Sequence, residues 1–226
     1  MKYKNIEKAK FISRPNRFIA HVEIDGKTEI AHVKNTGRCK ELLKEGATVY
    51  VQKSDNPLRK TKYDLITVEK NKMLINMDSQ APNKVFGEWV KQGNFTPNIS
   101  LIKPECKYGN SRFDFYIEAD ERKIFAEIKG VTLEENGVVM FPDAPTERGV
   151  KHIRELCECV NNGYEGYIIF IIQMEKCKYF TPNKVTHPEF AEALKFASKC
   201  GVNIKALNCR VAFDELKILN EVEVRL

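Results

Sequence analysis

The sequence predicts an α/β protein of the α+β type in two parts, a small β-barrel followed by a mixed sheet flanked by helices. Three observations lead to this fold class. The chain has 226 residues, of which 42% are hydrophobic and 30% charged, enough to build buried cores. Its first third contains short alternating strands with turn signals between them. The remainder alternates strand patterns with helix patterns.

The first third is predicted to form the barrel. Residues 17–24 alternate, with one face made of Phe18, Ala20, Val22 and Ile24. Asp25-Gly26 then predicts a hairpin to a second strand over 27–33. The further elements predicted here are a short helix over 38–44 and strands over 47–52 and 63–69. Short strands at even spacing favour a partly open barrel of the OB type, whose loops hold nucleic acid.

The second domain is predicted to follow residue 78, giving domains over 1–78 and 79–226. Its helix patterns repeat apolar residues three and four positions apart, and residues 166–173 form a continuous apolar strand, as expected when both faces are covered. The predicted helices cover 81–92, 147–161 and 188–200, and the predicted strands cover 112–118, 123–129, 138–141, 166–173 and, last, 202–211.

Several classes of protein are disfavoured by composition. The longest apolar run, residues 167–172, is too short to span a bilayer, and the charged N-terminal residues do not resemble a secretory signal. The seven cysteines include no Cys-x-x-Cys pair, so neither a zinc site nor a disulfide framework is expected. Reduced thiols in a cytoplasmic protein without a membrane segment are the prediction.

Basic charge is concentrated in the first third. The formal net charge is +6, and residues 1–76 hold 17 Lys and Arg against 9 Asp and Glu. Such asymmetry is typical of a surface that binds a polyanion, usually nucleic acid, although a solvated basic surface explains it equally well. The side chains expected to hold a phosphate backbone are those of Arg14, Arg17, Arg38, Arg59, Lys60 and Lys62.

The stretch 112–129 carries the candidate chemistry. Asp114 lies mid-strand, and Glu127 and Lys129 lie on one face of the next strand. With the turn centred on 120–121, residues whose numbers add to 241 pair, which sets Asp114 opposite Glu127. Two carboxylates about 5 Å apart repel each other, and a magnesium or manganese ion would offset the repulsion. A surface salt-bridge cluster is the alternative interpretation.

This arrangement of Asp114, then Glu127-x-Lys129 on the adjacent strand, resembles the PD-(D/E)XK nuclease superfamily. Pro142-Asp143 follows the Glu-x-Lys instead of preceding it, so Asp114 is the matching aspartate. Further motifs resemble the sugar fermentation stimulation protein A family: Arg17-Phe18, Asn35-Thr36-Gly37-Arg38, Lys107-Tyr108-Gly109, Ser111-Arg112-Phe113-Asp114, Phe141-Pro142-Asp143-Ala144, Thr146-Glu147-Arg148-Gly149, Lys151-His152 and Glu155-Leu156.

The resemblance implies an OB-like domain followed by a nuclease-like domain, with DNA binding. By position, it implies that Asp114 and Glu127 hold the metal, that the carbonyl of Ile128 helps, and that Lys129 is the catalytic lysine. The accessory candidates are Glu105, Glu147, Arg148, Lys151 and His152.

Three functions remain open on the sequence. The first is a DNA-binding protein that cleaves its substrate with a divalent metal. The second is a regulator of sugar-utilisation genes that binds DNA on a nuclease fold without turnover. The third is a basic RNA-binding module, which OB-like folds also permit.

Overall fold

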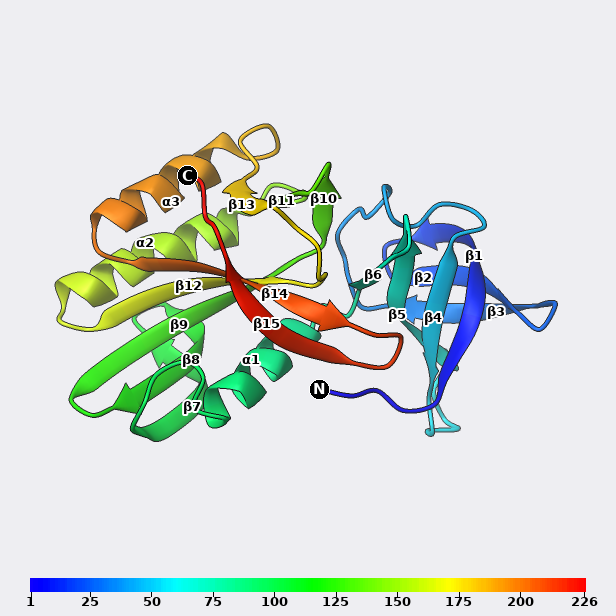
Figure 1. The fold of residues 1–226 in the computed structure, drawn as a ribbon, viewed down its shortest axis with the longest axis horizontal. Helices are drawn as coiled ribbons and strands as arrows, with labels where there is room; N and C mark the ends of the chain where they lie inside the picture. Colours follow the sequence, from blue (N-terminus) through cyan, green and yellow to red (C-terminus); the bar gives the residue numbers. More distant parts are fainter.

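The computed structural model describes all of residues 1–226, arranged as two lobes side by side (Figure 1). One lobe contains the first six strands, and the other contains three helices and the remaining strands. No helix is long and apolar enough to cross a membrane.

The first lobe is a closed β-barrel. Its strand order is β3-β2-β1-β4-β5-β6, and a parallel pairing of β3 with β5 closes it. Alternate side chains of β2 point inward. Ala20, Val22 and Ile24 are buried, as predicted. The barrel strands are β1 Ile6–Asn16, β2 Ile19–Ile24, β3 Lys27–Val33, β4 Thr48–Lys53, β5 Tyr63–Lys70 and β6 Met73–Asn76. This barrel confirms the predicted OB-like fold.

The hairpin between β2 and β3 forms as predicted. Asp25 and Gly26 both have positive φ, 50° and 74°, which is the backbone of a type I′ turn. The prediction for Phe18 is wrong. Phe18 lies in the turn before β2 and is 50% exposed, because the inward alternation begins only with Ala20.

The helix predicted over 38–44 does not form. Cys39 adopts a left-handed backbone, with φ 47°, which a helix excludes. The segment makes a single turn in which the Leu43 amide bonds the Cys39 carbonyl at 2.9 Å. Cys39, Leu42 and Leu43 are buried, so their apolar pattern reflects a loop that covers the barrel. Strand β1 was not predicted, and its first residues are only partly buried.

The second lobe is built on a six-stranded mixed sheet of order β15-β14-β12-β9-β8-β7, in which β9, β12 and β14 are parallel. A three-stranded sheet of β10, β11 and β13 lies beside it. The strands are β7 Ile99–Tyr108, β8 Ser111–Ala119, β9 Arg122–Val131, β10 Leu133–Glu135, β11 Val138–Phe141, β12 Glu165–Ile172, β13 Tyr179–Pro182, β14 Asn203–Val211 and β15 Leu216–Val222.

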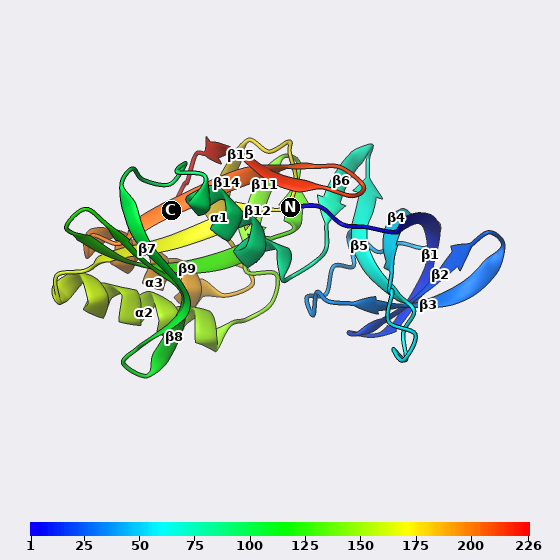
Figure 2. The same cartoon turned by 90° about the horizontal axis from the view of Figure 1, so that it is seen from below.

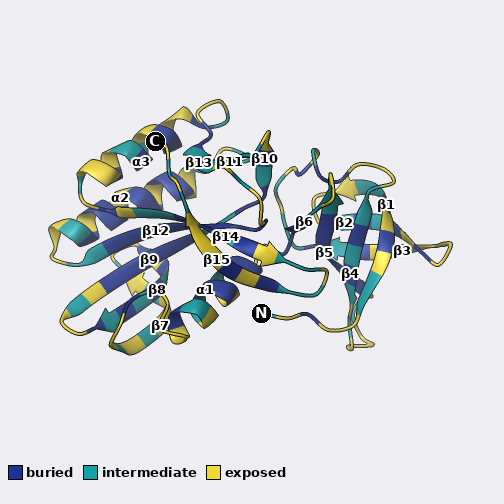
Figure 3. Cartoon of the chain, viewed as in Figure 1, coloured by how far each residue is buried: buried dark blue, intermediate teal, exposed yellow.

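Helices cover both faces of this sheet. Helix α1 (Ala81–Lys91) lies on one face, and α2 (Glu147–Asn161) and α3 (Pro188–Lys199) lie on the other (Figure 2). All three helices match their predicted ranges within one residue. The central strands β9 and β12 are therefore buried on both sides (Figure 3).

Both edge strands of this six-stranded sheet are absent from the predicted elements, as are β6, β10 and β13 elsewhere. Strand β7 is mostly exposed and lacks an apolar alternation, and β15 follows the strand that was predicted to be the last. Pairing with a neighbour holds both strands in the sheet, and the buried Leu216 and Ile218 also anchor β15 to the core.

A buried polar cluster joins the barrel to the second lobe. The side-chain amide of Gln173, after β12, donates to the Asn76 carbonyl, the Asn76 side chain and the Asp78 carbonyl at 2.9–3.1 Å. Tyr3 and Lys34 both donate to the Asp78 carboxylate. These contacts satisfy polar groups where the chain passes between the lobes.

We expect Gln173→Ala to lower the free energy of unfolding by roughly 2–4 kcal/mol, because it leaves buried acceptors without a donor. Chemical denaturation measures this change, with Gln92→Ala, at an exposed position, as the matched control. Equal losses in the two variants would contradict the role given to Gln173.

Candidate metal and phosphodiester site

The β8–β9 hairpin has the predicted register. Five pairs, from Ala119–Arg122 to Phe115–Ala126, have residue numbers that add to 241. The pairing stops there, one position before Asp114 and Glu127 would meet. The two carboxylates therefore lie at the point where the strands separate.

Strand β8 changes face at Asp114. Phe113 packs on the α2 side, with its ring 5.5 Å from that of Phe125, whereas Phe115 packs on the α1 side, 5.3 Å from Phe86. In a regular strand, residues two apart share a face. This turn of the backbone directs Asp114 into the gap between the strands.

The Asp114 carboxylate accepts a hydrogen bond from β9 where the backbone of a paired strand would otherwise accept it. Its Oδ2 accepts a hydrogen bond from the Ile128 amide at 2.8 Å, and its Oδ1 accepts one from the Asn83 side chain at 2.6 Å. Asn83 lies in the first turn of α1. The sequence analysis missed Asn83, since no local pattern marks a residue whose partner lies on a distant strand.

Glu127 is buried and hydrogen-bonded on one oxygen only. Its Oε1 accepts a hydrogen bond from the Lys129 ammonium at 2.6 Å and contacts Nδ1 of His152 at 2.5 Å. Its Oε2 is buried and has no hydrogen-bond partner. An unpartnered buried carboxylate oxygen is energetically costly.

The environment drives the pKa values of the two carboxyls in opposite directions. Burial raises the pKa of Asp114, and the Glu127 charge raises it further, against the lowering effect of the bonds from Ile128 and Asn83. Burial acts to raise the pKa of Glu127 as well, but the hydrogen bond from His152 and the charge of Lys129 outweigh it, and the pKa is lowered.

Among the accessory candidates, two lie close to the carboxylates. His152 contacts Glu127, and Arg148 donates from Nε to Nε2 of His152 at 3.3 Å. Lys151 is directed elsewhere, to the carbonyl of Asn110 at 3.1 Å.

The two acidic accessory candidates point away from the site. Glu147 is exposed and lies 3.5 Å from the ring of His187. Glu105, with φ 51°, is exposed and pairs with Arg112 at 3.3 Å. The structure thus does not bring Glu105 or Glu147 to Asp114.

Not all of the predicted basic residues are free. Arg59 forms two hydrogen bonds to the Asp64 carboxylate at 2.7 and 2.9 Å, and Lys62 pairs with Glu29 at 3.3 Å. Lys60 is exposed.

Arg14 donates four hydrogen bonds of 2.7–3.0 Å to the main-chain carbonyls of Arg17, Asn35, Gly37 and Arg38. Arg14 therefore holds loops in place instead of offering its charge to a ligand.

The loops that Arg14 holds form a basic groove of about 440 Å³. Exposed Arg17, Arg38 and Lys40 line it, and the second lobe contributes Ala144, which lies just before the α2 N-cap Thr146. Next to Ala144, the Asp143 carboxylate packs against Gly37 so closely that an added Cβ at Gly37 would clash with it. Asp143 is thus a contact between the lobes.

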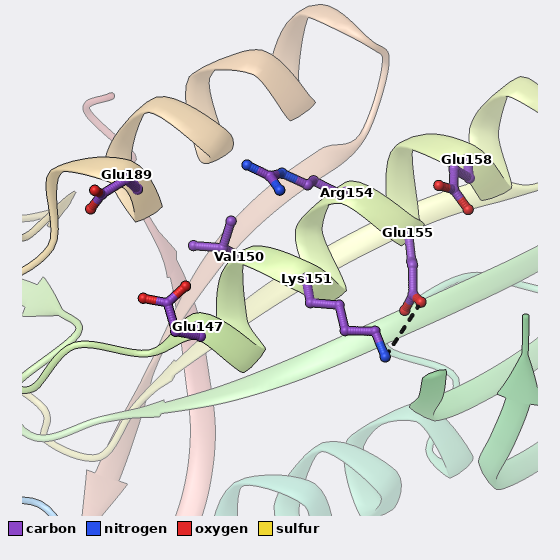
Figure 4. Close-up of a pocket in the computed structure, with 7 residues that line it drawn as sticks. All are labelled: Glu147, Val150, Lys151, Arg154, Glu155, Glu158 and Glu189. Atoms are coloured by element: carbon purple, nitrogen blue, oxygen red, sulfur yellow. Dashed lines mark ion pairs between the residues drawn. The ribbon is translucent and has the colours of Figure 1, made fainter. Parts of the chain in front are cut away.

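A separate pocket of about 430 Å³ lies beside α2 and the start of α3 (Figure 4). Four glutamates line it, with Lys151 and Arg154 as the only basic residues, so it does not favour a phosphate. None of Asp114, Glu127 and Lys129 lines it.

The structure contains no group of three or more His, Cys, Asp or Glu side chains placed to hold a metal ion. All seven cysteines are free.

Together, the fold defines a class of two-domain proteins in which an OB barrel precedes a mixed α/β domain with a Glu-x-Lys strand. Two family models match: "SfsA N-terminal OB domain" over residues 12–77 and "Sugar fermentation stimulation protein RE domain" over residues 80–215. The chain belongs to this sugar fermentation stimulation protein (SfsA) family.

Relatives match over the whole chain. Sugar fermentation stimulation protein homologs from Ruminiclostridium cellulolyticum and Clostridium beijerinckii are 63% and 61% identical over 226 residues, covering 100% of both chains. The structure of Pyrococcus furiosus SfsA in complex with Ca²⁺ matches with a TM-score of 0.91 and 30% identity, covering 100% of this chain and 98% of that chain.

We expect Glu127→Gln to lower the pKa of Asp114 toward its ordinary value, because the substitution removes the neighbouring charge. The glutamine oxygen can still accept from His152 and Lys129. Carbon-13 NMR of the Asp114 carboxyl across acidic and neutral pH measures the shift. Glu118→Gln, on β8 with Asp114, is the control, and an unchanged Asp114 titration in Glu127→Gln would contradict the coupling.

The two shifted carboxyls make the stability of the folded state depend on pH in opposite senses. The raised pKa of Asp114 favours the folded state at acidic pH, and this contribution is lost as pH rises through the folded-state pKa. The lowered pKa of Glu127 acts oppositely, since its contribution is present above the ordinary glutamate pKa and is lost on acidification.

Proposed function

We propose that this protein is a DNA-binding phosphodiesterase that uses a divalent cation held by Asp114 and Glu127. The observation that carries the proposal is the buried Oε2 of Glu127, which has no partner, together with the Asp114 carboxyl, whose pKa the Glu127 charge raises. A cation satisfies this oxygen and removes the repulsion between the two acids.

The residues fit a hard cation such as magnesium or manganese. Both side chains offer carboxylate oxygens, and Mg²⁺ in proteins commonly uses one or two carboxylates while water and substrate phosphate supply the other positions. The carbonyl of Ile128 is a further candidate oxygen. The related Pyrococcus furiosus structure is a complex with Ca²⁺, another cation that prefers oxygen ligands, which supports this choice.

When bound, the cation supplies an activated water and neutralises charge on the phosphate. Lys129 supplies the remaining positive charge. Its ammonium lies 2.6 Å from Oε1 of Glu127, and the Lys129 side chain is 15% exposed, so the ammonium has little hydration to lose when it turns to a phosphate oxygen. Asn83 and the Ile128 amide keep Asp114 in place during this change.

The basic groove of Arg17, Arg38 and Lys40 would bind the DNA backbone. The groove reaches Ala144, and α2, which begins three residues later, carries the histidine that contacts Glu127. DNA lying in the groove would therefore approach the carboxylates along the N-terminal end of α2.

A second candidate function is a DNA-binding regulator of sugar-utilisation genes without turnover. The family's description, a sugar fermentation stimulation protein, favours it. Cleavage separates the two functions, because both require DNA binding.

We expect nicking of plasmid DNA in Mg²⁺ or Mn²⁺, lost on removal of the metal by chelation. Asp114→Ala and Lys129→Ala should abolish cleavage because they remove a cation ligand and the phosphate-facing charge. DNA binding should persist in Lys129→Ala. Lys123→Ala, on the same strand but remote from the carboxylates, is the control. Binding without cleavage under every metal would favour the regulator.

We expect the double variant Arg17→Ala/Arg38→Ala to weaken DNA binding and to reduce the slope of log affinity against log salt by about 2 for duplex DNA. Fluorescence anisotropy across a salt series measures both. Lys195→Ala/Lys199→Ala removes the same charge from α3 and should leave the slope unchanged. Equal effects of the two double variants would argue against the groove.

A further inference from the structure

We propose that His152, itself held by Arg148, is the positioning residue that orients Glu127 and thereby frees Lys129 to act on substrate. The inference rests on the proposed function, since it concerns how the same carboxylate presents one oxygen to a cation. His152 and Arg148 thereby act together on the site, beside Asp114, Glu127 and Lys129.

The hydrogen-bond pattern defines which ring nitrogen of His152 carries the proton. Nε of Arg148 always bears hydrogen and donates to Nε2 of His152 at 3.3 Å, so Nε2 is the acceptor. Nδ1 then carries the proton and donates it to Oε1 of Glu127 at 2.5 Å. A neutral ring satisfies both contacts.

The ring has little freedom to move. The side chains of His152 and Glu127 are each 4% exposed, and the ring of Phe113 meets the imidazole edge-on at 6.0 Å. Arg148 lies four residues before His152, so both occupy one face of α2. The helix thus fixes the direction from which Oε1 receives its donor.

Two donors on Oε1 have two consequences. They stop the carboxylate from rotating, which leaves the buried Oε2 as its one open oxygen. They also allow the Lys129 ammonium to move away from Glu127, because His152 still donates a hydrogen bond to Oε1 when the ammonium turns to a phosphate oxygen. Without His152, that movement would leave a buried carboxylate with no donor, which is costly.

The test uses His152→Leu, which removes the donor at similar volume, and His152→Asn, whose amide nitrogen lies near the position of Nδ1. The matched control is His21→Asn, a part-buried barrel histidine that contacts Ser13. Circular dichroism establishes that each variant is folded. The readouts are Mn²⁺ affinity by calorimetry, the nitrogen-15 shifts of the His152 ring, and the rate of DNA cleavage.

We expect His152→Leu to weaken Mn²⁺ binding and to lower kcat by roughly 10–100-fold each. His152→Asn should recover part of both, and the wild-type ring should show hydrogen on Nδ1 alone. A purely structural role would not give recovery by asparagine. Wild-type Mn²⁺ affinity and kcat in His152→Leu, or hydrogen on Nε2, would overturn the inference.

The two proposals can fail separately. Wild-type protein that binds no Mn²⁺ and cleaves no DNA would overturn the proposed function, and the role of His152 with it. If wild-type protein binds Mn²⁺ and cleaves DNA, and His152→Leu binds Mn²⁺ equally tightly, the proposed function stands and only the positioning role is overturned.

Discussion

A buried carboxylate at the centre of the mixed sheet is the constraint on which the site depends. Glu127 lies on β9, which has strand neighbours on both sides and helices on both faces. Burial there opposes ionisation, so donors must reach the carboxylate from nearby. Lys129 supplies one from the same strand, and α2 supplies the other through His152. The position of α2 on the sheet is therefore part of the site's chemistry as well as of the core.

The separation of β8 from β9 is the second requirement. A ladder that continued past Phe115 would occupy the Ile128 amide with backbone, whereas here the Asp114 carboxylate accepts that hydrogen. The same change of direction sends Phe113 and Phe115 into different cores. Hydrophobic packing on both sides thus holds open the gap that the two acids share, and α1 contributes Asn83 to the arrangement.

Positive charge in the barrel serves two different purposes. Arg14 and Arg59 form hydrogen bonds inside the protein. Arg14 organises loops, and Arg59 neutralises Asp64. Arg17 and Arg38 remain exposed along the groove because Arg14 holds their carbonyls. Net charge counted from a sequence therefore overstates what a ligand can contact, since a guanidinium paired inside the protein offers no free donor.

The sequence by itself determined the class of fold, the three helices, the alternating barrel strand from Ala20 to Ile24 and the β8–β9 register, because these follow from local periodicity and turn chemistry. The edge strand β7 lacks such a pattern, and apolar residues around Leu42 indicated a helix where the chain makes a covering loop. Only the tertiary structure decided that Asn83 meets Asp114 and that His152 meets Glu127. Those partners are 31 and 25 residues apart, and a contact over such a distance depends on how helices dock on the sheet, which no local spacing encodes.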